Sequence, residues 1–114
     1  MLTTKEKGLL EYVVSYCERV KELVEGVTKE DFDNSKNLRE LICFNLFQIG
    51  ELVSIFEDDF INKHNKIPWR EIKGMRNVIV HRYGTINMEK VWSTANEDIE
   101  PLEGHCKEIL YQGW

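Results

Sequence analysis

Apolar residues return every three or four positions in the first quarter of the chain, the spacing of one face of an α-helix. The run is Leu9, Leu10, Val13, Val14, Cys17, Val20, Leu23 and Val24. Thr3 followed by Glu6 has the spacing of a capping box at a helix start, and Gly26 is a suitable stop. We therefore predict a helix over residues 4–25, followed by a polar turn over residues 28–36.

A second amphipathic segment predicts a helix over residues 35–57. Its apolar residues are Leu38, Leu41, Ile42, Phe44, Leu46, Phe47, Ile49, Leu52, Val53, Ile55 and Phe56. They cover more than one stripe, so we expect two buried faces, one against the core and one against a partner subunit. Asn45, Gln48 and Glu51 are polar at three-residue spacing, and Gly50 would let another helix approach closely.

The second half of the chain continues the helical pattern. Residues 59–66 read as a short helix or turn, Pro68 suits the start of a helix over 68–82, and residues 84–86 form a break. Asn87 can cap a last helix over 88–111, which Pro101 should kink or split near residue 100. The run Val78–Val80 resembles a strand, but no partner strand exists for it. We predict one all-α domain over residues 1–114, a bundle of four or five helices.

Composition narrows the class of protein without naming a function. The chain has 114 residues, 42% hydrophobic and 31% charged, which is typical of a globular domain rather than a disordered one. No apolar run is long enough to cross a bilayer and the N-terminus lacks a signal-peptide block, so we expect a cytoplasmic protein. Cys17, Cys43 and Cys106 are predicted to be reduced buried thiols. No histidine or cysteine spacing indicates a metal, and no cofactor is expected.

Charge is distributed unevenly along the chain. The net charge is −5, but residues 63–82 carry six basic residues and one acid, a local balance of +5 that leaves −10 for the remainder. The overall acidity argues against a protein that coats nucleic acid, whereas a basic island suits a local phosphate site. A solvated helix face, or ion pairs with the acidic regions, would explain the island equally well.

Residues 69–83, WREIKGMRNVIVHRY, hold the most informative side chains. On a helix of about 100° per residue, Arg76 falls within the apolar arc, with Asn77 and His81 on its flank. A guanidinium keeps its charge, so at an apolar position it requires an acidic partner, an anionic ligand or a wet interface. Glu51 is the candidate partner. In the purely structural interpretation, Arg76 and Glu51 form a buried ion pair and His81 binds a backbone carbonyl.

The functional interpretation is a phosphate site. Arg76 would bind a phosphoryl oxygen, His81 titrates near neutrality and could move a proton, and Asn77 would position a phosphate or hydroxyl. Tyr83 could donate a hydrogen bond or stack on a base. No carboxylate pair or metal-ligand set accompanies these residues, which favours metal-free phosphoryl transfer. RNA supplies its own nucleophile, the 2′-hydroxyl, so RNA cleavage fits this set best.

Residues 76–83 match the R-x4-H-x-Y motif, and the chain resembles the HepT-like toxins of the HEPN superfamily. The flanking segments are similar too: Ile67–Trp69 and Gly74–Asn77 around the motif, Gln48–Glu51 before it and Val91–Trp92 after it. The resemblance implies a small all-α, two-fold symmetric homodimer whose two motifs face a shared cleft. It also implies a metal-independent endoribonuclease, the toxin of a toxin–antitoxin pair.

The resemblance assigns roles residue by residue. Arg76, Asn77 and His81 would be catalytic. Glu51, the candidate partner of Arg76 from the helical pattern, would be a supporting residue. Tyr83 would be a site residue and the acceptor of AMP from a minimal nucleotidyltransferase antitoxin. Arg76 and His81 lie about 140° apart on one helix, a separation that two copies across a two-fold axis could overcome.

Two other classes of function remain open from the sequence. The chain could be a non-catalytic protein that binds a nucleotide or partner and whose Tyr83 serves only as the AMP acceptor. The overall acidity favours this alternative slightly, because RNA would be repelled outside the basic island. It could also be a helical scaffold in which Arg76 belongs to a structural ion pair.

Overall fold

A computed structural model describes residues 1–81 and 87–112, and for Met75 and residues 77–81 only the helical backbone. Its described part consists of helices joined by turns and loops, without a strand, as predicted. The elements are α1 (Thr4–Val24), α2 (Lys29–Asn34), α3 (Lys36–Val53), α4 (Asp58–Lys63), α5 (Trp69–His81), α6 (Met88–Ser93), the π-helical turn η2 (Thr94–Asp98) and α7 (Ile99–Gln112).

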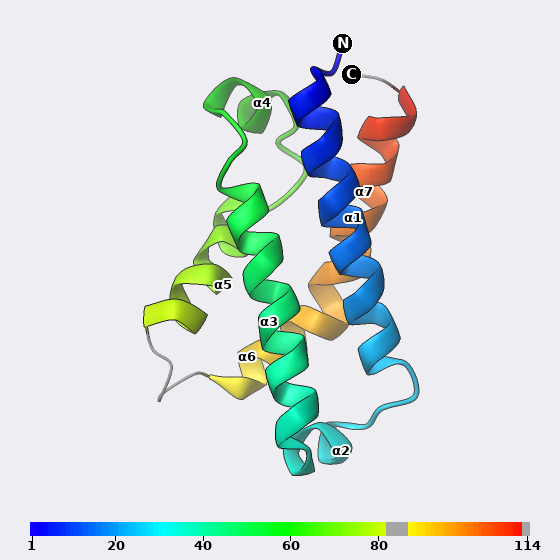
Figure 1. The fold of residues 1–114 in the computed structure, drawn as a ribbon, viewed down its shortest axis with the longest axis vertical. Helices are drawn as coiled ribbons and strands as arrows, with labels where there is room; N and C mark the ends of the chain where they lie inside the picture. Colours follow the sequence, from blue (N-terminus) through cyan, green and yellow to red (C-terminus); the bar gives the residue numbers. More distant parts are fainter. Residues whose placement is uncertain (82–86, 113–114) are drawn as a thin grey trace.

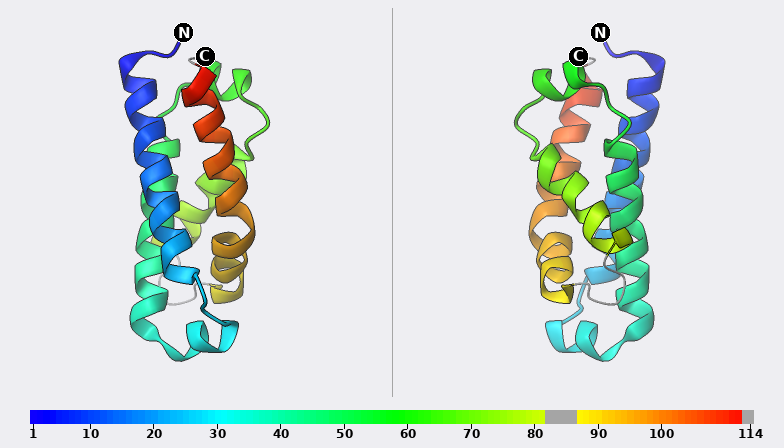
Figure 2. Two further views of the ribbon diagram at one scale, coloured as in Figure 1. Left: turned by 90° about the vertical axis from the view of Figure 1, so that its right-hand side faces the viewer. Right: turned by 90° about the vertical axis from the view of Figure 1, so that its left-hand side faces the viewer.

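Three long helices define the bundle. α1, α3 and α7 run along the long axis of the molecule, and α5 crosses them obliquely (Figures 1 and 2). α1 packs on both α3 and α7, whereas α5 packs mainly on α3. α5 therefore lies on the outside of a three-helix layer, in contact with the helix that carries Glu51.

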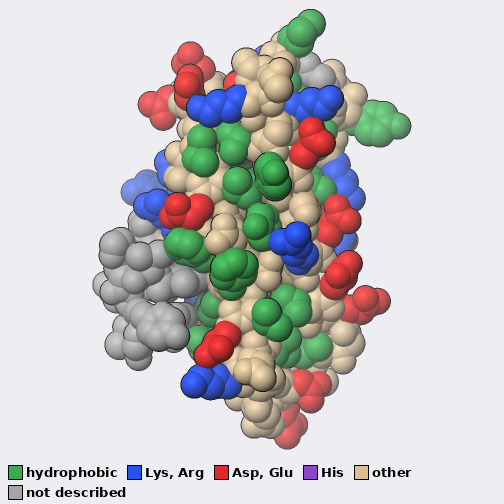
Figure 3. Space-filling view, in the orientation of Figure 1, with side chains coloured by type: hydrophobic (Ala, Val, Ile, Leu, Met, Phe, Trp, Pro, Cys, Tyr) green, Lys and Arg blue, Asp and Glu red, His purple; other side chains and the backbone are tan. Residues whose placement is uncertain are grey.

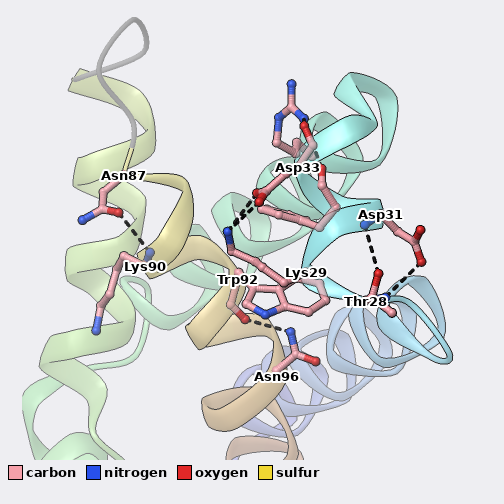
Figure 4. Close-up of polar contacts among 10 residues, drawn as sticks. Thr28, Lys29, Asp31, Asp33, Asn87, Lys90, Trp92 and Asn96 are labelled. Carbon is pink, nitrogen blue, oxygen red and sulfur yellow. Dashed lines mark hydrogen bonds and ion pairs between the residues drawn. The ribbon is translucent and has the colours of Figure 1, made fainter.

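Local sequence signals set most helix ends. Thr3 and Glu6 form the predicted capping box, and Gly26 follows α1 with a φ of 70°, the left-handed backbone that glycine adopts readily. The Asn87 side chain accepts a hydrogen bond from the Lys90 N–H at the start of α6, as predicted (Figure 4). Ser35 caps α3 in the same way.

The polar turn predicted for residues 28–36 is wrong, because α2 occupies most of it. Thr28 and Asp31 form a second capping box, which the figure shows at the start of this helix (Figure 4). Phe32 is fully buried, with its ring centroid 4.9 Å from that of Trp92. One buried aromatic and a capping box are enough to hold six residues in a helix that is too short to show a periodic pattern.

The second long helix is shorter than predicted and ends at Val53 rather than near residue 57. The chain then turns so that Phe56 stacks on Phe60 at 4.3 Å and lies 5.4 Å from Trp69. Phe56 is buried in this aromatic cluster between α4 and α5, not on the face of α3. Phe56 continues the apolar pattern of α3 in the sequence, and for this reason the predicted helix is one turn too long.

The expected disturbance near Pro101 takes the form of a widened turn. The Ile99 N–H donates to the carbonyl of Thr94, five residues earlier, and η2 leads directly into α7 with Pro101 in its first turn. Because η2 continues into α7, Pro101 lies within a helical stretch, where it cannot donate to the preceding turn and where its ring would clash with the carbonyl four residues earlier in a regular α-helix. A widened turn directly before Pro101 is a known way for a helix to adjust to such a clash. The chain from Met88 to Gln112 thus stays helical throughout.

The core lies between α1, α3 and α7. All three cysteines are buried and free, which confirms the prediction. Burial raises the pKa of the Cys106 thiol to about 12 and that of Cys17 further, so both stay protonated at neutral pH. Within the described residues, no helix is long and apolar enough to cross a membrane.

Candidate functional site

The contact between α3 and α5 brings together Arg76 and Glu51. Arg76 Nη1 donates to Glu51 Oε1 at 3.2 Å, so the partner predicted for this arginine is confirmed. The side chains of Arg76 and Glu51 are 33% and 44% exposed. The pair is therefore not the buried ion pair of the structural interpretation, and water or another anion can reach the guanidinium.

Gly50 allows α5 to come this close. A Cβ atom added at Gly50 would lie 2.6 Å from the Arg76 Cβ and 3.3 Å from the Ile72 carbonyl oxygen. Only a residue without a side chain fits there, as the sequence suggested. The Cβ of Arg76 therefore packs on the backbone of α3 at Gly50. Its guanidinium bonds to Glu51, the next residue of that helix.

The rest of the predicted site lies along and beyond the end of α5. Asn77 and His81 belong to this helix, so positions 76, 77 and 81 share one rigid element. Their placement on the helix follows from its register, in which His81 lies about 7.5 Å along the axis from Arg76. Tyr83 lies outside the described residues.

An apolar stripe on the outer side of α3 is exposed to solvent in this single chain. Leu41 and Phe44 are 51% and 54% exposed, and Ile55, just beyond the helix, is 45% exposed. The space-filling view shows hydrophobic side chains gathered along this face (Figure 3). Glu51 lies seven residues after Phe44, on the same side of α3, so the stripe leads directly to the Arg76–Glu51 pair.

A second ion pair, which the sequence did not reveal, connects α1 to α7. Lys21 Nζ lies 2.7 Å from Glu103 Oε1, and only 6% of the Glu103 side chain is exposed. The hydrogen bond from Lys21 to the carboxylate raises the pKa of that lysine. The available signal was an acid inside the apolar pattern of the last helix, next to Leu102 and before Cys106.

Two cavities lined by described residues lie elsewhere. One, of about 130 Å³, is bounded by residues 63–67 and by His105 and Glu108 of α7. Burial, and the neighbouring Lys63, lower the pKa of His64 in its wall. The described residues contain no cluster of three or more His, Cys, Asp or Glu side chains that could hold a metal ion.

A family model described as ribonuclease HepT-like matches residues 13–109, which covers α3, α5 and most of α1 and α7. The chain belongs to the HepT-like ribonuclease family. The family places the Arg76–Glu51 contact in the domain of a ribonuclease, and the R-x4-H-x-Y motif falls within the matched residues.

Individual HepT-like relatives agree over nearly the whole length of the chain. A protein of Caldanaerobacter subterraneus subsp. tengcongensis named "Putative RNase" is 39% identical over 101 residues, 89% of this chain and 90% of its own length. A protein of Thermococcus cleftensis named "Probable ribonuclease HepT" is 31% identical and covers 90% of this chain and 94% of its own.

A longer relative contains the same unit as one part. In a Methanocaldococcus jannaschii protein named "Gamma-glutamylcyclotransferase and putative RNase", the match is 27% identical over 91% of this chain but spans about half, 47%, of the relative. The comparison with solved structures gives no significant match.

Proposed function

We propose that this chain is a metal-independent endoribonuclease that acts on RNA as a two-fold symmetric homodimer. The observation that carries the proposal is the Arg76 side chain, which is one-third exposed and bound to Glu51 of α3. Arg76 shares α5 with Asn77 and His81. A cation that is held in place and that water can reach is able to bind a phosphoryl group, whereas a cation buried in a structural ion pair is not. Its place in a HepT-like ribonuclease domain supports RNA as the substrate.

In the proposed reaction, the 2′-hydroxyl of RNA attacks the adjacent phosphorus. His81 takes the proton from that hydroxyl as the 2′-oxygen–phosphorus bond forms. The bond from phosphorus to the 5′-oxygen breaks, and the leaving oxygen receives a proton, with the two copies of His81 in a dimer dividing the transfers. Arg76 stabilises the negative charge on the phosphoryl oxygens and Asn77 orients them. The products are a 2′,3′-cyclic phosphate and a 5′-hydroxyl.

The exposed apolar stripe supports the dimer. Leu41, Phe44 and Ile55 form a surface that a second copy would cover, and the spacing of Leu41, Phe44, Gln48 and Glu51 keeps these residues on one side of α3. Because Glu51 ends this row, a second copy seated on it would bring its own α5 near the first. The arrangement would bring together Arg76 and His81 residues that one helix holds about 140° apart.

We further propose that the protein is the toxin of a toxin–antitoxin pair. A minimal nucleotidyltransferase would be the antitoxin and would transfer AMP to Tyr83. A phosphate-linked nucleotide on this tyrosine would stand two residues from His81 and obstruct the RNA path. This part rests on the motif and the family, and requires the nucleotidyltransferase as a second protein.

RNA cleavage in excess chelator tests the central claim. The unmodified protein should cut RNA and leave cyclic phosphate ends, and His81→Ala should lose roughly a hundredfold or more in rate. Activity that survives His81→Ala, or that requires an added metal, contradicts the proposed mechanism. If the folded, unmodified dimer does not cleave RNA but accepts AMP at Tyr83, the protein is instead a modification target that binds a nucleotide or partner.

A further inference from the structure

The outer side of α5 carries a row of positions that ends at the catalytic motif. Residues 70, 73, 77 and 81 follow one another at intervals of three and four, so their positions fall within about 80° around the helix. Arg70 and Lys73, the first two, have exposed side chains. Asn77 and His81, the last two, are proposed catalytic residues.

The surface beside this row is open. Gly74 lies next to this row, about 20° beyond its edge around the helix, and a Cβ atom added there would meet nothing within 4 Å. By contrast, the side of α5 that packs on α3 is closed: Gly50 of α3, which faces it, has no space even for a methyl group. The helix surface is therefore open at Gly74, and Arg70 and Lys73 beside it are exposed.

Arg70 and Lys73 carry charges that no described carboxylate neutralises, a property they share with Lys5 and Lys7 of α1; what sets them apart is their place in line with the proposed catalytic residues. Among the described residues, Lys21, Lys29, Lys36, Lys107 and Arg76 each have a carboxylate within 4.0 Å. Neither Arg70 nor Lys73 has an acidic partner within the part of the chain that the structure describes. Glu71, the single acid between residues 63 and 82, lies about 100° or more around the helix from both.

The charge of the molecule makes this side distinctive. The segment from residue 63 to 82 carries +5 and the remainder −10, so most of the surface repels a polyanion. Single unpaired lysines are common on protein surfaces. Here the two cations are in line with the proposed reacting groups, and positions 73, 77 and 81 are about 6 Å apart along the helix axis.

We propose that Arg70 and Lys73 bind backbone phosphates of single-stranded RNA on one side of the bond that is cut. This inference rests on the proposed function and adds the direction in which the substrate extends, from His81 along α5 toward its first turn. Arg70 and Lys73 are positioning residues, because they hold flanking nucleotides and do not touch the reacting phosphate. Phosphate contacts carry no base information, so this part of the substrate is held without sequence preference.

Binding and cleavage of a short, unstructured, fluorescently labelled RNA test the row. The variant is Arg70→Gln with Lys73→Gln, which removes two charges but keeps long polar side chains. The matched control is Lys5→Gln with Lys7→Gln, two exposed lysines of α1 that also lack a described acidic partner. Fluorescence anisotropy over a range of salt concentrations gives Kd, and single-site cleavage gives kcat and KM.

We expect the Arg70/Lys73 variant to raise Kd and KM roughly tenfold at low salt with kcat nearly unchanged. The slope of log affinity against log salt should become shallower by about 1.4, which is two contacts at about 0.7 each for a single strand. The Lys5/Lys7 control should match the wild type. Shortening the RNA on one side of the cut should weaken wild-type binding, and should have little additional effect on the Arg70/Lys73 variant.

The outcomes separate this inference from the proposed function. If the wild type cleaves RNA, and the Arg70/Lys73 variant matches it in KM and salt slope, the row is not a binding track but the ribonuclease stands. If the wild type binds RNA and the Arg70/Lys73 variant binds more weakly with a salt slope shallower by about 1.4, yet neither cleaves, the two phosphate contacts stand and the proposed catalysis fails. If the wild type neither binds nor cleaves RNA, both are overturned.

Discussion

Two helix contacts in this bundle are each crossed by one ion pair, and the pairs differ in their access to water. Between α1 and α7, Lys21 reaches a Glu103 carboxylate that is almost entirely buried. Between α3 and α5, Arg76 meets Glu51 with a third or more of both side chains exposed. The first pair lies against Cys17 and Cys106 in the core, whereas the second lies beside the proposed catalytic helix.

From this difference we expect the first contact to stabilise the fold and the second to hold a side chain of the proposed active site. A buried carboxylate that loses its cation is left desolvated, so its partner cannot be exchanged cheaply. A partly exposed ion pair contributes only about 0–1 kcal/mol, so under the proposed function we expect Arg76 to exchange the Glu51 carboxylate for a phosphate at a smaller cost than a buried pair would require. Exposure, rather than the presence of an acidic partner, is therefore the property of Arg76 on which its proposed role depends.

The largest effect on activity, with only a small effect on stability, is expected when Arg76 is replaced. Arg76→Ala is expected to lower kcat/KM for RNA roughly 10²–10³-fold, because a charge-stabilising donor is lost in the transition state. The free energy of unfolding in urea should fall by about 1–2 kcal/mol, because the partly exposed ion pair contributes about 0–1 kcal/mol and alanine also removes the stem of Arg76 that packs on α3. Arg76→Lys is the control for charge without the planar fork. If Arg76→Ala lowers stability while its folded fraction keeps the wild-type kcat/KM, Arg76 has a structural role and not a catalytic one.

Gly50→Ala should disturb the same contact through packing. The new Cβ would lie 2.6 Å from the Arg76 Cβ, so α3 and α5 must separate, at a cost of about 1–3 kcal/mol in free energy of unfolding. Cleavage should fall with it, because Arg76 moves. Gly104→Ala in α7, where an added Cβ meets nothing within 4 Å, is the matched control and should stabilise by about 0.5–1 kcal/mol. Equal effects of the two substitutions would show that the close approach is not needed.

The smallest effect is expected at the other contact. Glu103→Ala should lower the free energy of unfolding by about 1–2 kcal/mol, less than for a fully buried pair, because the half-exposed Lys21 can return to water. The kcat/KM of the folded fraction should stay at the wild-type value, since Glu103 bridges α1 and α7 and takes no part in the α3–α5 contact. Glu103→Gln, which keeps the shape, is the control. A loss of cleavage with unchanged stability would contradict the structural assignment of this pair.

The long elements could be predicted because each carries its own signal. Apolar spacing fixed α1, and the charge of Arg76 inside an apolar arc identified Glu51 as its partner before any distance was known. α2 was missed because six residues are too few to show a period, and its stability comes from Phe32 meeting Trp92. The end of α3 was placed too late, since Phe56 is buried by α4 and α5 rather than by its own helix.

The Arg76–Glu51 contact and Gly50 could be named from the sequence, whereas their arrangement in space could not. Gly50 could be singled out from sequence, but its contact with Arg76 depends on how two helices cross. The exposure of Arg76 could not be foreseen, because it depends on which side of α3 is left uncovered. The roles of Asn77, His81 and Tyr83, and the dimer, stay predictions that the proposed experiments address.

The π-helical turn before Pro101 has a consequence for how members of the family can be aligned. Such a turn accommodates one residue more than an α-helical turn in the same axial space, so it shifts the phase of everything after it by about 100°. Val91, Ala95 and Ile99 are buried at two successive intervals of four, and Leu102 and Cys106 then resume the ordinary rhythm. A relative with one residue fewer between Val91 and Ile99 could run as a regular helix and bury the same faces. A single-residue gap at this point of an alignment would therefore mark a change of helix type and leave the fold intact.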